Sequence, residues 1–544
     1  MKRQILTCLF LGISVFGQVV TYPVFGESWY VANEHFTINS NPHAQLMVQP
    51  IPRAFYQNIF QNSGSFWFQK EFGNSQDYPL SQNTLYSFQI GQSKWTIDPV
   101  ARLARYTSGG SEYPEDIRLN TGNLGFEING YLPQGMGVYL SYFNGREWRK
   151  FKNIRRLNDE KGVAWHLKST PGVDSFDFDH SEMALTYGTS DLFVEIGKRS
   201  HRWGHGIRGT LLISDKSPAY PSFRMVFSSF GNFQFTYLHG WLNSTIKDTT
   251  MAKYYGEGVG SERKFMIPKQ IAAHRIDWRP FSNLTIGASE SVVYAVRQFE
   301  AIYWFPVIPF LSAQQYLGDL DNVQMDVDFA YYPIKNLKLY GEFYVDEWKH
   351  SNTFDKINNN WFAYQTGLMI TEGFGFIPKS TFHLEYTKLD PRVYVHKYKF
   401  NTFEHFGYPL GFWTGNNADD LFLCFKKYFK QRIEFRMFYA NTRKGMTRYP
   451  DEVGFDDDSL NIQYSELEKQ YGGKYVPFLE HKTDERRQVG FGLTLPIWRD
   501  FVVDFQAEKI IWEHRNYLGA NEWSDFETDE KWDFFIDFSY RFPY

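Results

Sequence analysis

The last strand-like segment of this chain places seven apolar side chains on one face, and six of them are aromatic. The face consists of Trp532, Phe534, Ile536, Phe538, Tyr540, Phe542 and Tyr544. Side chains alternate between the two faces of a β-strand, so Asp533, Asp537 and other mostly polar residues lie on the opposite face. A strand of a soluble sandwich could alternate as well, but so aromatic a face is typical of an outer-membrane barrel, with lipid outside and water inside.

The same period of two residues returns along the whole chain, with polar, turn-rich stretches between the segments. In one example, Val323, Met325, Val327, Phe329 and Tyr331 share a face. Residues 337–346 alternate in the same way after a short turn at 333–336, so the two segments are predicted to form a hairpin. Because a membrane-crossing strand takes ~10 residues, we predict an all-β transmembrane antiparallel β-barrel of about 16 to 18 strands, plugged by loops or by the N-terminal segment.

The N-terminus has the pattern of an export signal. Lys2 and Arg3 precede an apolar run from Ile5 to Val20 that is too short to span a bilayer comfortably. We expect a signal peptide at 1–26, with an alternative end at residue 17, an irregular or plug segment at 27–60 and the barrel at 61–544. No later segment has ~20 uninterrupted apolar residues, which excludes a helical membrane protein. The expected location is the outer membrane of a Gram-negative bacterium.

Composition agrees with this class. Aromatic residues make up 19% of the chain although its mean hydropathy is −0.45, as expected when half of each strand faces an aqueous lumen. The formal net charge of −4 is small for this length, so there is no basic field for nucleic acid and no nucleic-acid partner is expected. Cys8 lies in the export signal, so a disulfide framework is excluded, and we interpret Cys424 as a barrel-wall side chain.

The segment 197–206 has the most unusual chemistry of the chain. Gly204 and Gly206 predict a sharp bend at a strand end. Arg199 and Arg202 are then expected to point into the barrel or its mouth, where inward carboxylates of two paired strands would be their counterions. We favour a structural network that stiffens the barrel over direct ligand contact. The candidate residues for this lumen network or for ligand binding are Arg199, His201, Arg202, Trp203, His205, Asp326, Asp328, Glu342 and Asp346.

Metal binding and catalysis find little support in the same residues. His201 and His205 would share a face only on a helix, which the neighbouring glycines oppose, and no third ligand is evident nearby. Ser200 has no Gly-x-Ser-x-Gly elbow around it, and the chain has no Asp-x-Asp-x-Asp-Gly calcium loop. We therefore expect no cofactor, no metal and no enzymatic activity.

The segment from Tyr303 to Phe310 is the longest aromatic, loop-like stretch, because its prolines oppose a central strand. Stacking on sugar faces is one use for it. Two apolar alternatives are favoured together over that use, namely insertion at the membrane interface and folding inward over the barrel mouth. Trp348, Trp361 and Trp413 are likewise interpreted as girdle or loop-core residues rather than as sugar platforms.

Several short motifs follow one another along the middle of the chain. They are Gly197-Lys198-Arg199, Arg202-Trp203-Gly204-His205-Gly206, Leu212-Ile213-Ser214-Asp215, His274-Arg275-Ile276, Gly318 to Asn322, Tyr340-Gly341-Glu342 and His405 to Gly411. In this order they resemble the Wzi family of capsule-assembly outer-membrane proteins, over roughly residues 193–423. The resemblance implies a non-catalytic surface lectin that holds capsular polysaccharide, in a barrel with an occluded lumen.

Two functions from different classes remain open. The first is the binding and anchoring of capsular or other surface polysaccharide. Its partners would be that polysaccharide, outer-membrane lipid and lipopolysaccharide, and the barrel assembly machinery during insertion. The alternative is a porin or specific channel for solutes, whose charged lumen sets selectivity.

Overall fold

The computed structural model describes most of the chain from residue 85 onward. The described residues are 48–49, 85–110, 117–148, 161–162, 165–166, 175–189, 191–230, 232–251, 265–355, 360–429, 433–445, 476–479, 482–498, 501–515, 517–519 and 522–540. The expected signal peptide lies outside them, and so does the expected 27–60 segment apart from β1 (Val48–Gln49). No helix among the described residues is long and apolar enough to cross a membrane.

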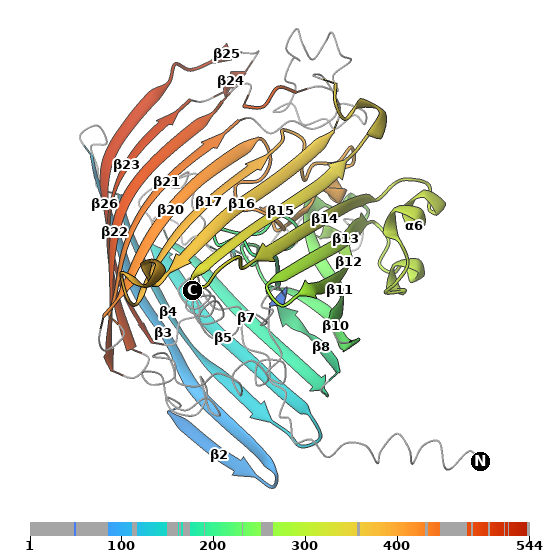
Figure 1. The fold of residues 1–544 in the computed structure, drawn as a ribbon, viewed down its shortest axis with the longest axis horizontal. Helices are drawn as coiled ribbons and strands as arrows, with labels where there is room; N and C mark the ends of the chain where they lie inside the picture. The colour runs from blue at the N-terminus through green and yellow to red at the C-terminus, as the bar shows by residue number, and fades with distance from the viewer. Residues whose placement is uncertain are drawn as a thin grey trace.

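The strands form a closed antiparallel barrel of 18 strands, which confirms the predicted fold class. Each wall strand pairs with the next along the chain, and the last one pairs with the first to close the ring (Figure 1). The wall strands are β3 (Ser93–Gly110), β4 (Ile117–Tyr131), β5 (Met136–Trp148), β7 (Ser175–Gly188), β8 (Leu192–Arg199), β10 (Tyr220–Phe230), β11 (Phe233–Lys247), β12 (Met266–Phe281), β13 (Leu284–Ala295), β14 (Asn322–Tyr331), β15 (Leu337–Glu347), β16 (Trp361–Thr371), β17 (Ser380–Leu389), β20 (Ala418–Tyr428), β21 (Glu434–Lys444), β22 (Asp484–Trp498), β23 (Phe501–His514) and β26 (Glu527–Tyr540).

Shorter elements lie at the ends of the wall or inside it. A short hairpin strand, β2 (Tyr86–Ile90), pairs with β3, and β6 (Trp165–His166) pairs with β7. Three two-stranded ladders join β1 to β9 (Arg202–Trp203), β18 (Glu404–His405) to β19 (Tyr408–Pro409), and β24 (Tyr517–Gly519) to β25 (Glu522–Trp523). The helical turns are η1 (Thr249–Met251), η2 (Ala301–Trp304), α6 (Phe310–Tyr316), η3 (His350–Asn352), η4 (Glu372–Gly375) and η5 (Lys399–Asn401).

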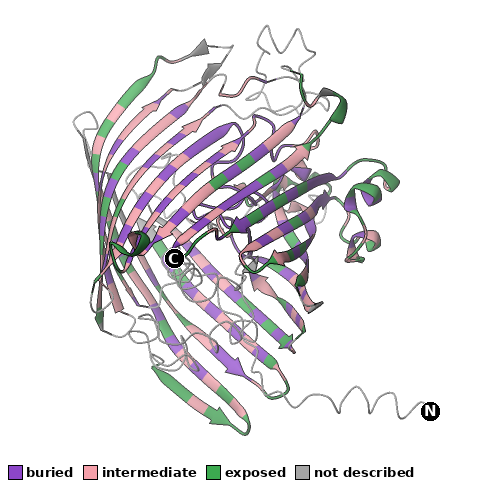
Figure 2. Ribbon diagram, viewed as in Figure 1, coloured by how far each residue is buried: buried purple, intermediate pink, exposed green. Residues whose placement is uncertain are grey.

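Burial alternates along the wall strands, as Figure 2 shows, because successive side chains face the lumen and the lipid in turn. On β26, Trp532, Phe534 and Phe538 are exposed, whereas Asp533 and Asp537 are buried. The same alternation occurs on β14, where Met325, Val327, Phe329 and Tyr331 are exposed and Asp326 and Asp328 are buried. The predicted alternation is therefore confirmed at these positions. Tyr540 and Val323, which were expected on the outward faces, are buried, and Phe542 and Tyr544 lie outside the described residues.

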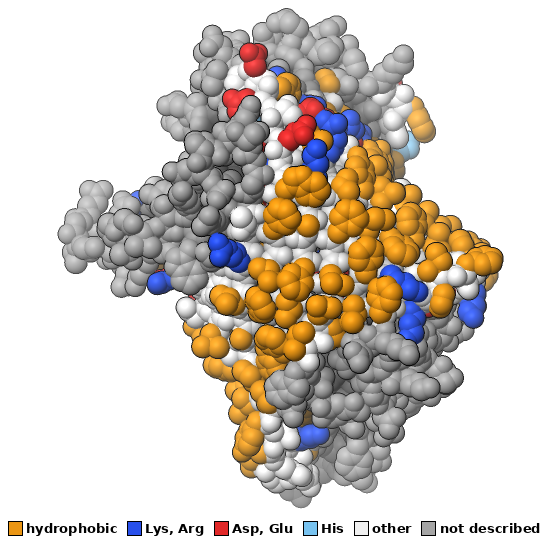
Figure 3. All heavy atoms as spheres, turned by 90° about the vertical axis from the view of Figure 1, so that its left-hand side faces the viewer, with side chains coloured by type: hydrophobic (Ala, Val, Ile, Leu, Met, Phe, Trp, Pro, Cys, Tyr) orange, Lys and Arg blue, Asp and Glu red, His pale blue; other side chains and the backbone are white. Residues whose placement is uncertain are grey.

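Exposed apolar side chains form a band on the outer face of the wall strands. Figure 3 shows this band on the face that includes β22, β23 and β26, with acidic and basic side chains gathered near the top of the view. Outward ion pairs such as Lys509 with Glu530, at 3.2 Å, belong to strand ends beyond the band. A lipid-facing belt of this kind, ~25 Å tall, is typical of outer-membrane barrels.

Connections differ in length at the two ends of the barrel. At one end the strands are joined by a few residues, as at 189–191, 282–283 and 332–336. At the other end the connections 200–219, 296–321 and 390–417 are much longer. Outer-membrane barrels have short periplasmic turns and long extracellular loops, so these long connections mark the extracellular end.

Two of the long connections enter the lumen. We call residues 200–219, between β8 and β10, the inner strap, and residues 390–417, between β17 and β20, the inner loop. Apolar side chains of both pack with inward-facing wall residues into one core inside the barrel. Its members include Trp203, Leu211, Leu212, Ile213, Leu238, Ile271, Val293, Tyr344, Leu389, Tyr394, Phe403, Leu410 and Phe412. At this level the lumen is filled by protein.

The third long connection, residues 296–321, which we call the outer annex, packs on the outside of the wall. Figure 1 shows its helix α6 beside the ring of strands rather than within it. The expectation that Tyr303 to Phe310 could fold inward over the barrel mouth is therefore wrong. The reason is that β11, β12 and β13 present a cluster of aromatic side chains on their outer face, against which the annex packs.

Cys424 is buried on β20 beside Phe422 and Ala440, which confirms its place in the barrel wall.

Candidate functional site: the filled lumen and its rim

The inner strap turns sharply just after β9, as its glycines predict. Gly204 has a φ of 111°, a conformation that side-chain-bearing residues rarely adopt. A Cβ atom on Gly206 would overlap Gln365 Oε1 and the carbonyl oxygen of Gly209. These two positions therefore let the strap backbone lie directly against itself and the inner wall.

Two wall carboxylates hold the strap by its backbone amides. Glu342 of β15 accepts hydrogen bonds from the N–H groups of Leu211 at 2.7 Å and Leu212 at 3.2 Å. Glu385 of β17 accepts hydrogen bonds from the N–H groups of Ile207 at 2.7 Å and Arg208 at 3.1 Å. All four hydrogen bonds are buried, where a backbone amide without an acceptor would cost free energy. The strap is thereby fixed to strands that are far around the ring from β8 and β10, where it begins and ends.

Arg208 provides a further anchor between the strap and the wall. Its guanidinium donates from Nε at 3.0 Å and from Nη2 at 3.2 Å to the two oxygens of Asp420 on β20. The same group lies 4.8 Å from the ring centroid of Phe422 and 5.1 Å from that of Trp413. Because Trp413 belongs to the inner loop, Arg208 joins the strap, the wall and the loop at one point.

The structure brings the residues singled out from the sequence to the lumen side of the barrel. Arg199, His201, Arg202, Trp203, His205, Asp326, Asp328 and Glu342 are buried, and Asp346 is half-buried. Trp203 lies in the core inside the barrel, and its backbone pairs with Val48 of β1.

The ion pairs differ from those expected. Arg199 lies 3.5 Å from Glu182, and Arg202 lies 3.5 Å from Asp215. Of the carboxylates proposed as their counterions, Asp328 instead receives two hydrogen bonds from Arg275, and Glu342 receives the strap amides described above. The reason is topological, because Arg199 ends β8 beside β7, where Glu182 lies, whereas β14 is several strands further around the ring.

The serine and histidines of the strap make separate contacts. Ser200 donates to Glu182 at 3.0 Å, whereas His201 Nε2 lies 2.8 Å from Ser222 Oγ. Burial and nearby cationic groups hold the pKa of His201 and the pKa of His205 well below the usual range, so both imidazoles are neutral. Across the described part of the chain, no group of three or more His, Cys, Asp or Glu residues is arranged to hold a metal ion.

Sequence reasoning missed several residues that hold the strap. Glu385, Asp420 and Tyr340 were not among the candidate site residues, although Tyr340 Oη donates to Glu385 at 2.6 Å. The alternation of β17 and β20 puts Glu385 and Asp420 on the inward face, so the strand pattern contained a signal for both. The strand pattern does not show the path of the strap through the lumen. That path determines which inward carboxyl groups accept hydrogen bonds from the strap amides.

The inner loop is held by contacts at both of its halves. Asp346 accepts a hydrogen bond from the Tyr394 N–H at 2.6 Å, and Tyr394 Oη donates to the Leu211 carbonyl at 2.5 Å. His405 Nδ1 accepts a hydrogen bond from the Asn243 N–H at 2.9 Å. Burial, with the positive charges of Lys269 and Lys198, lowers the pKa of His405 to about 3. The loop therefore depends on an uncharged histidine at this point.

Part of the inner loop reaches the extracellular rim and remains accessible. We call its accessible residues, 396–400 with Glu404 and Phe406, the rim face. Its Tyr398 and Phe400 rings are nearly parallel, with centroids 5.5 Å apart, and both are half-exposed. Lys397 Nζ donates to the Asp319 carbonyl of the outer annex at 3.2 Å, and Thr245 near the end of β11 lies against Glu404. Aromatic rings beside the ammonium groups of Lys397 and Lys399 offer stacking and charge-assisted hydrogen bonds to a ligand.

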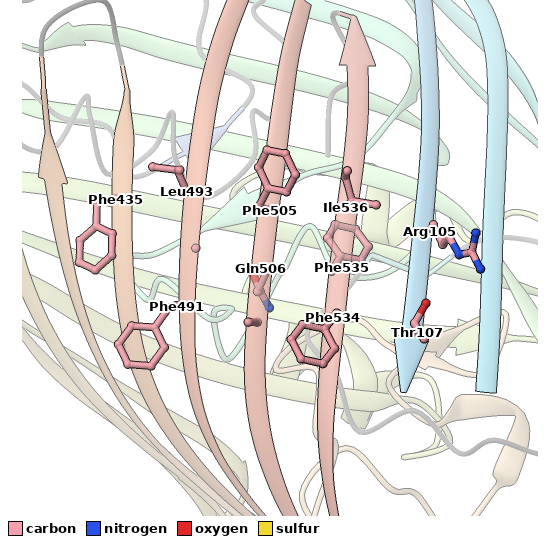
Figure 4. Close-up of a pocket in the computed structure, with 12 residues that line it drawn as sticks. Arg105, Thr107, Phe435, Phe491, Leu493, Phe505, Gln506, Phe534, Phe535 and Ile536 are labelled. Carbon is pink, nitrogen blue, oxygen red and sulfur yellow. The ribbon is translucent and has the colours of Figure 1, made fainter. Parts of the chain in front are cut away.

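A groove of about 440 Å³ lies elsewhere, on the outer wall between β21 and β3 (Figure 4). Its lining includes Phe491, Leu493, Phe505 and Phe534, which are exposed on the lipid-facing side, and Arg105 at one edge. Because these side chains belong to the lipid-facing band, the groove is not a lumen site for a solute.

The fold and the site define a class, namely an outer-membrane β-barrel whose lumen is filled by its own extracellular connections. The model of the family called capsule assembly protein Wzi matches residues 144–512. The chain belongs to this family, which confirms the resemblance seen in the sequence motifs. The comparison with curated proteins gave no match.

Solved structures with the same architecture include Wzi of Escherichia coli, described as a carbohydrate-binding β-barrel involved in group 1 capsule assembly. The two chains are 14% identical, the likeness covers 96% of this chain and 100% of that one, and the TM-score is 0.56. OccAB2 of Acinetobacter baumannii is 9% identical, with 82% and 98% coverage and a TM-score of 0.43. OccK8 (OprE) of Pseudomonas aeruginosa is 8% identical, with the same coverage and the same TM-score. The likeness to Wzi shows a shared fold.

Proposed function

We propose that this protein binds capsular or other surface polysaccharide at the extracellular rim and anchors it to the outer membrane without chemical change. The observation that carries the proposal is that a member of the Wzi family fills its lumen with two connections and leaves the rim face accessible. A barrel filled in this way is built to hold a ligand at its mouth. The carbohydrate-binding description of Wzi of Escherichia coli agrees with this role.

The nine residues predicted from the sequence have, in this proposal, a positioning role. Eight of them are buried, so a polymer at the rim would not reach them. Their hydrogen bonds and ion pairs, together with those of Glu385 and Arg208, would keep the strap and the loop in place. The groups that touch sugar would be Tyr398 and Phe400, with Lys397 and Lys399 as donors to an acidic or hydroxyl-rich polymer.

Export would require the signal at residues 1–26, and insertion would require the barrel assembly machinery. The apolar band would contact outer-membrane lipid, including lipopolysaccharide in the outer leaflet.

Deleting the gene and measuring surface glycan on cells and in the culture supernatant tests the function. Polymer shed into the medium, with total synthesis unchanged, is the expected result. Unchanged cell-bound polymer would refute the anchoring role.

The rim face is tested with the double variant Tyr398→Ala, Phe400→Ala, expressed in the deletion strain. Loss of both stacking rings should reduce the fraction of polymer retained on cells at least severalfold, because each aromatic platform contributes on the order of 1 kcal/mol. Phe354→Ala is the matched control, since this ring is 99% exposed in a different extracellular connection. Equal retention in both variants would remove the rim face from the binding site.

A further inference from the structure

The outer annex covers a polar region on the lipid-facing side of the wall. Tyr237 and His239 of β11, His274 of β12 and Glu290 of β13 point outward, in the same alternation as the exposed Ile276. The carboxylate of Glu290 lies 3.2 Å from His274 Nε2. Without a cover, these groups would face hydrocarbon, where unpaired polar groups cost several kcal/mol.

The annex satisfies these groups with its own atoms. Glu290 accepts hydrogen bonds from the N–H groups of Phe310 and Leu311, each at 2.8 Å. The Trp304 ring stacks on His239 at a centroid distance of 4.1 Å, and the Phe310 ring lies 4.4 Å from that of His274. Tyr237 Oη also donates to the Tyr303 carbonyl at 2.7 Å. The annex therefore replaces lipid as the neighbour of this part of the wall.

Its height on the barrel places it at the outer leaflet. The exposed apolar residues on the outer face of β12 are Ile276, Trp278 and Phe281, and the annex begins to cover the strand at His274. The stretch from 281 to 276 rises about 12 Å at a strand tilt of about 40°, against a hydrocarbon band of about 25 Å. The band on this side is thus only half complete without the annex, and the missing half is the extracellular one.

The outward surface of the annex is mostly apolar, with Ser312 and Gln315 as exposed polar residues, and several of its backbone N–H groups are hydrogen-bonded. No charged residue occurs between Glu300 and Asp319. Its exposed apolar side chains are Val296, Phe299, Phe305, Val307, Leu311, Tyr316 and Leu320. The N–H groups of Tyr303, Phe305, Ile308, Ala313 and Leu317 bond within the annex, and Pro306 and Pro309 have none to satisfy. At its two ends, the Arg297 and Asp321 side chains pair at 2.6 Å.

We propose that the outer annex lies in the outer leaflet of the outer membrane, with Phe305, Val307 and Tyr316 among the acyl chains of the lipids. It completes the apolar band above β11 to β13 and shields Glu290 and His274 from hydrocarbon. The occupant of its outward surface is lipid rather than a protein, because the surface continues the exposed band of Ile276 and Trp278 and has no charge to pair with a partner.

Site-directed spin labelling of the full chain in lipid vesicles tests this placement. Val307→Cys and Tyr316→Cys, each in a Cys424→Ser background, are labelled, and collisions with oxygen and with a water-soluble nickel chelate are compared. Val327→Cys on β14 is the lipid-facing control, and Phe354→Cys is the water-facing control. We expect positions 307 and 316 to match Val327, with oxygen collisions severalfold above nickel collisions.

Two results would overturn the proposal. Collision rates like those at position 354 would put the annex in water, and low collision rates with both reagents would mean that a second copy or another protein covers it. Heat-modifiable mobility on gels shows that each variant has formed the barrel, so a failure to fold cannot be mistaken for either result. The outcome is independent of glycan retention.

Discussion

Glu342 and Glu385 each bind two backbone amides of the inner strap, so one side chain on each strand satisfies two buried donors. A strap that crosses a lumen has no sheet partner for its N–H groups, and buried donors need acceptors. Carboxylates of the wall meet this need, and at the scale of single residues they decide where the strap lies.

Replacing Glu342 by alanine tests this role. The amides of Leu211 and Leu212 would lose their acceptor, so the free energy that holds the strap closed should fall by about 1 to 3 kcal/mol. Hydrogen exchange at these two amides should become about 10-fold to 100-fold faster. Glu530→Ala is the control, because this carboxylate is exposed and its ion pair contributes little. Unchanged exchange in Glu342→Ala would contradict the anchoring role.

The inner loop, at the scale of an element, combines anchoring with exposure. Its buried half packs against the strap, whereas residues 396–400 and Phe406 stay accessible at the rim. His405 is buried next to the exposed Phe406. It accepts a hydrogen bond from the Asn243 N–H that only a neutral imidazole can accept. Protonation therefore opposes the closed arrangement of the loop.

The inner loop should loosen in acid for this reason. In the closed loop the pKa of His405 is lowered to about 3. When the loop opens, His405 regains its usual pKa near 6.5. As the pH falls below about 6.5, only the open state therefore takes up a proton. Between pH 7.5 and pH 4.5 the free energy of opening should decrease by about 2 to 3 kcal/mol.

Hydrogen exchange at the Phe403 amide, which bonds to the Tyr394 carbonyl inside the loop, reports this opening after correction for the intrinsic rate. His405→Gln should remove most of the pH dependence. If the free energy of loop opening still changes with pH in this variant, groups other than His405 cause the pH dependence.

The element patterns explain why some predictions succeeded. Alternation on β14 and β26 fixed which side chains face lipid, because a strand has only two faces. The path of the inner strap could not be predicted in the same way, since residues 204–219 have no period and their partners come from distant strands. For the segment Tyr303 to Phe310, two apolar placements were favoured over sugar stacking, and the contacts of the annex with β11 to β13 exclude the inward placement.

The whole molecule combines a complete barrel with an interior that resembles the core of a soluble protein. The core inside the barrel joins the strap, the loop and seven of the wall strands, so the wall and its contents support each other. Strand number and closure were predictable from length and periodicity, whereas the filling of the lumen was implied only by family resemblance. A filled lumen distinguishes anchoring from transport.

Planar bilayer recordings measure this difference. The purified protein should give no steady conductance of the size seen for open porins, because the strap and the loop occupy the lumen. A general porin reconstituted in the same way is the positive control. Long-lived openings in every successful insertion would favour the channel alternative over anchoring.

The strap is separated from its anchors by long stretches of chain: 131 residues to Glu342, 178 to Glu385 and 212 to Asp420. During export the strap emerges well before these partners. It cannot be seated until β20 has arrived, and the ring itself closes only when β26 meets β3. Contacts so distant in sequence form slowly. The strap can therefore be seated only after β15, β17 and β20 have joined the wall, because its buried amides and Arg208 find their acceptors only then.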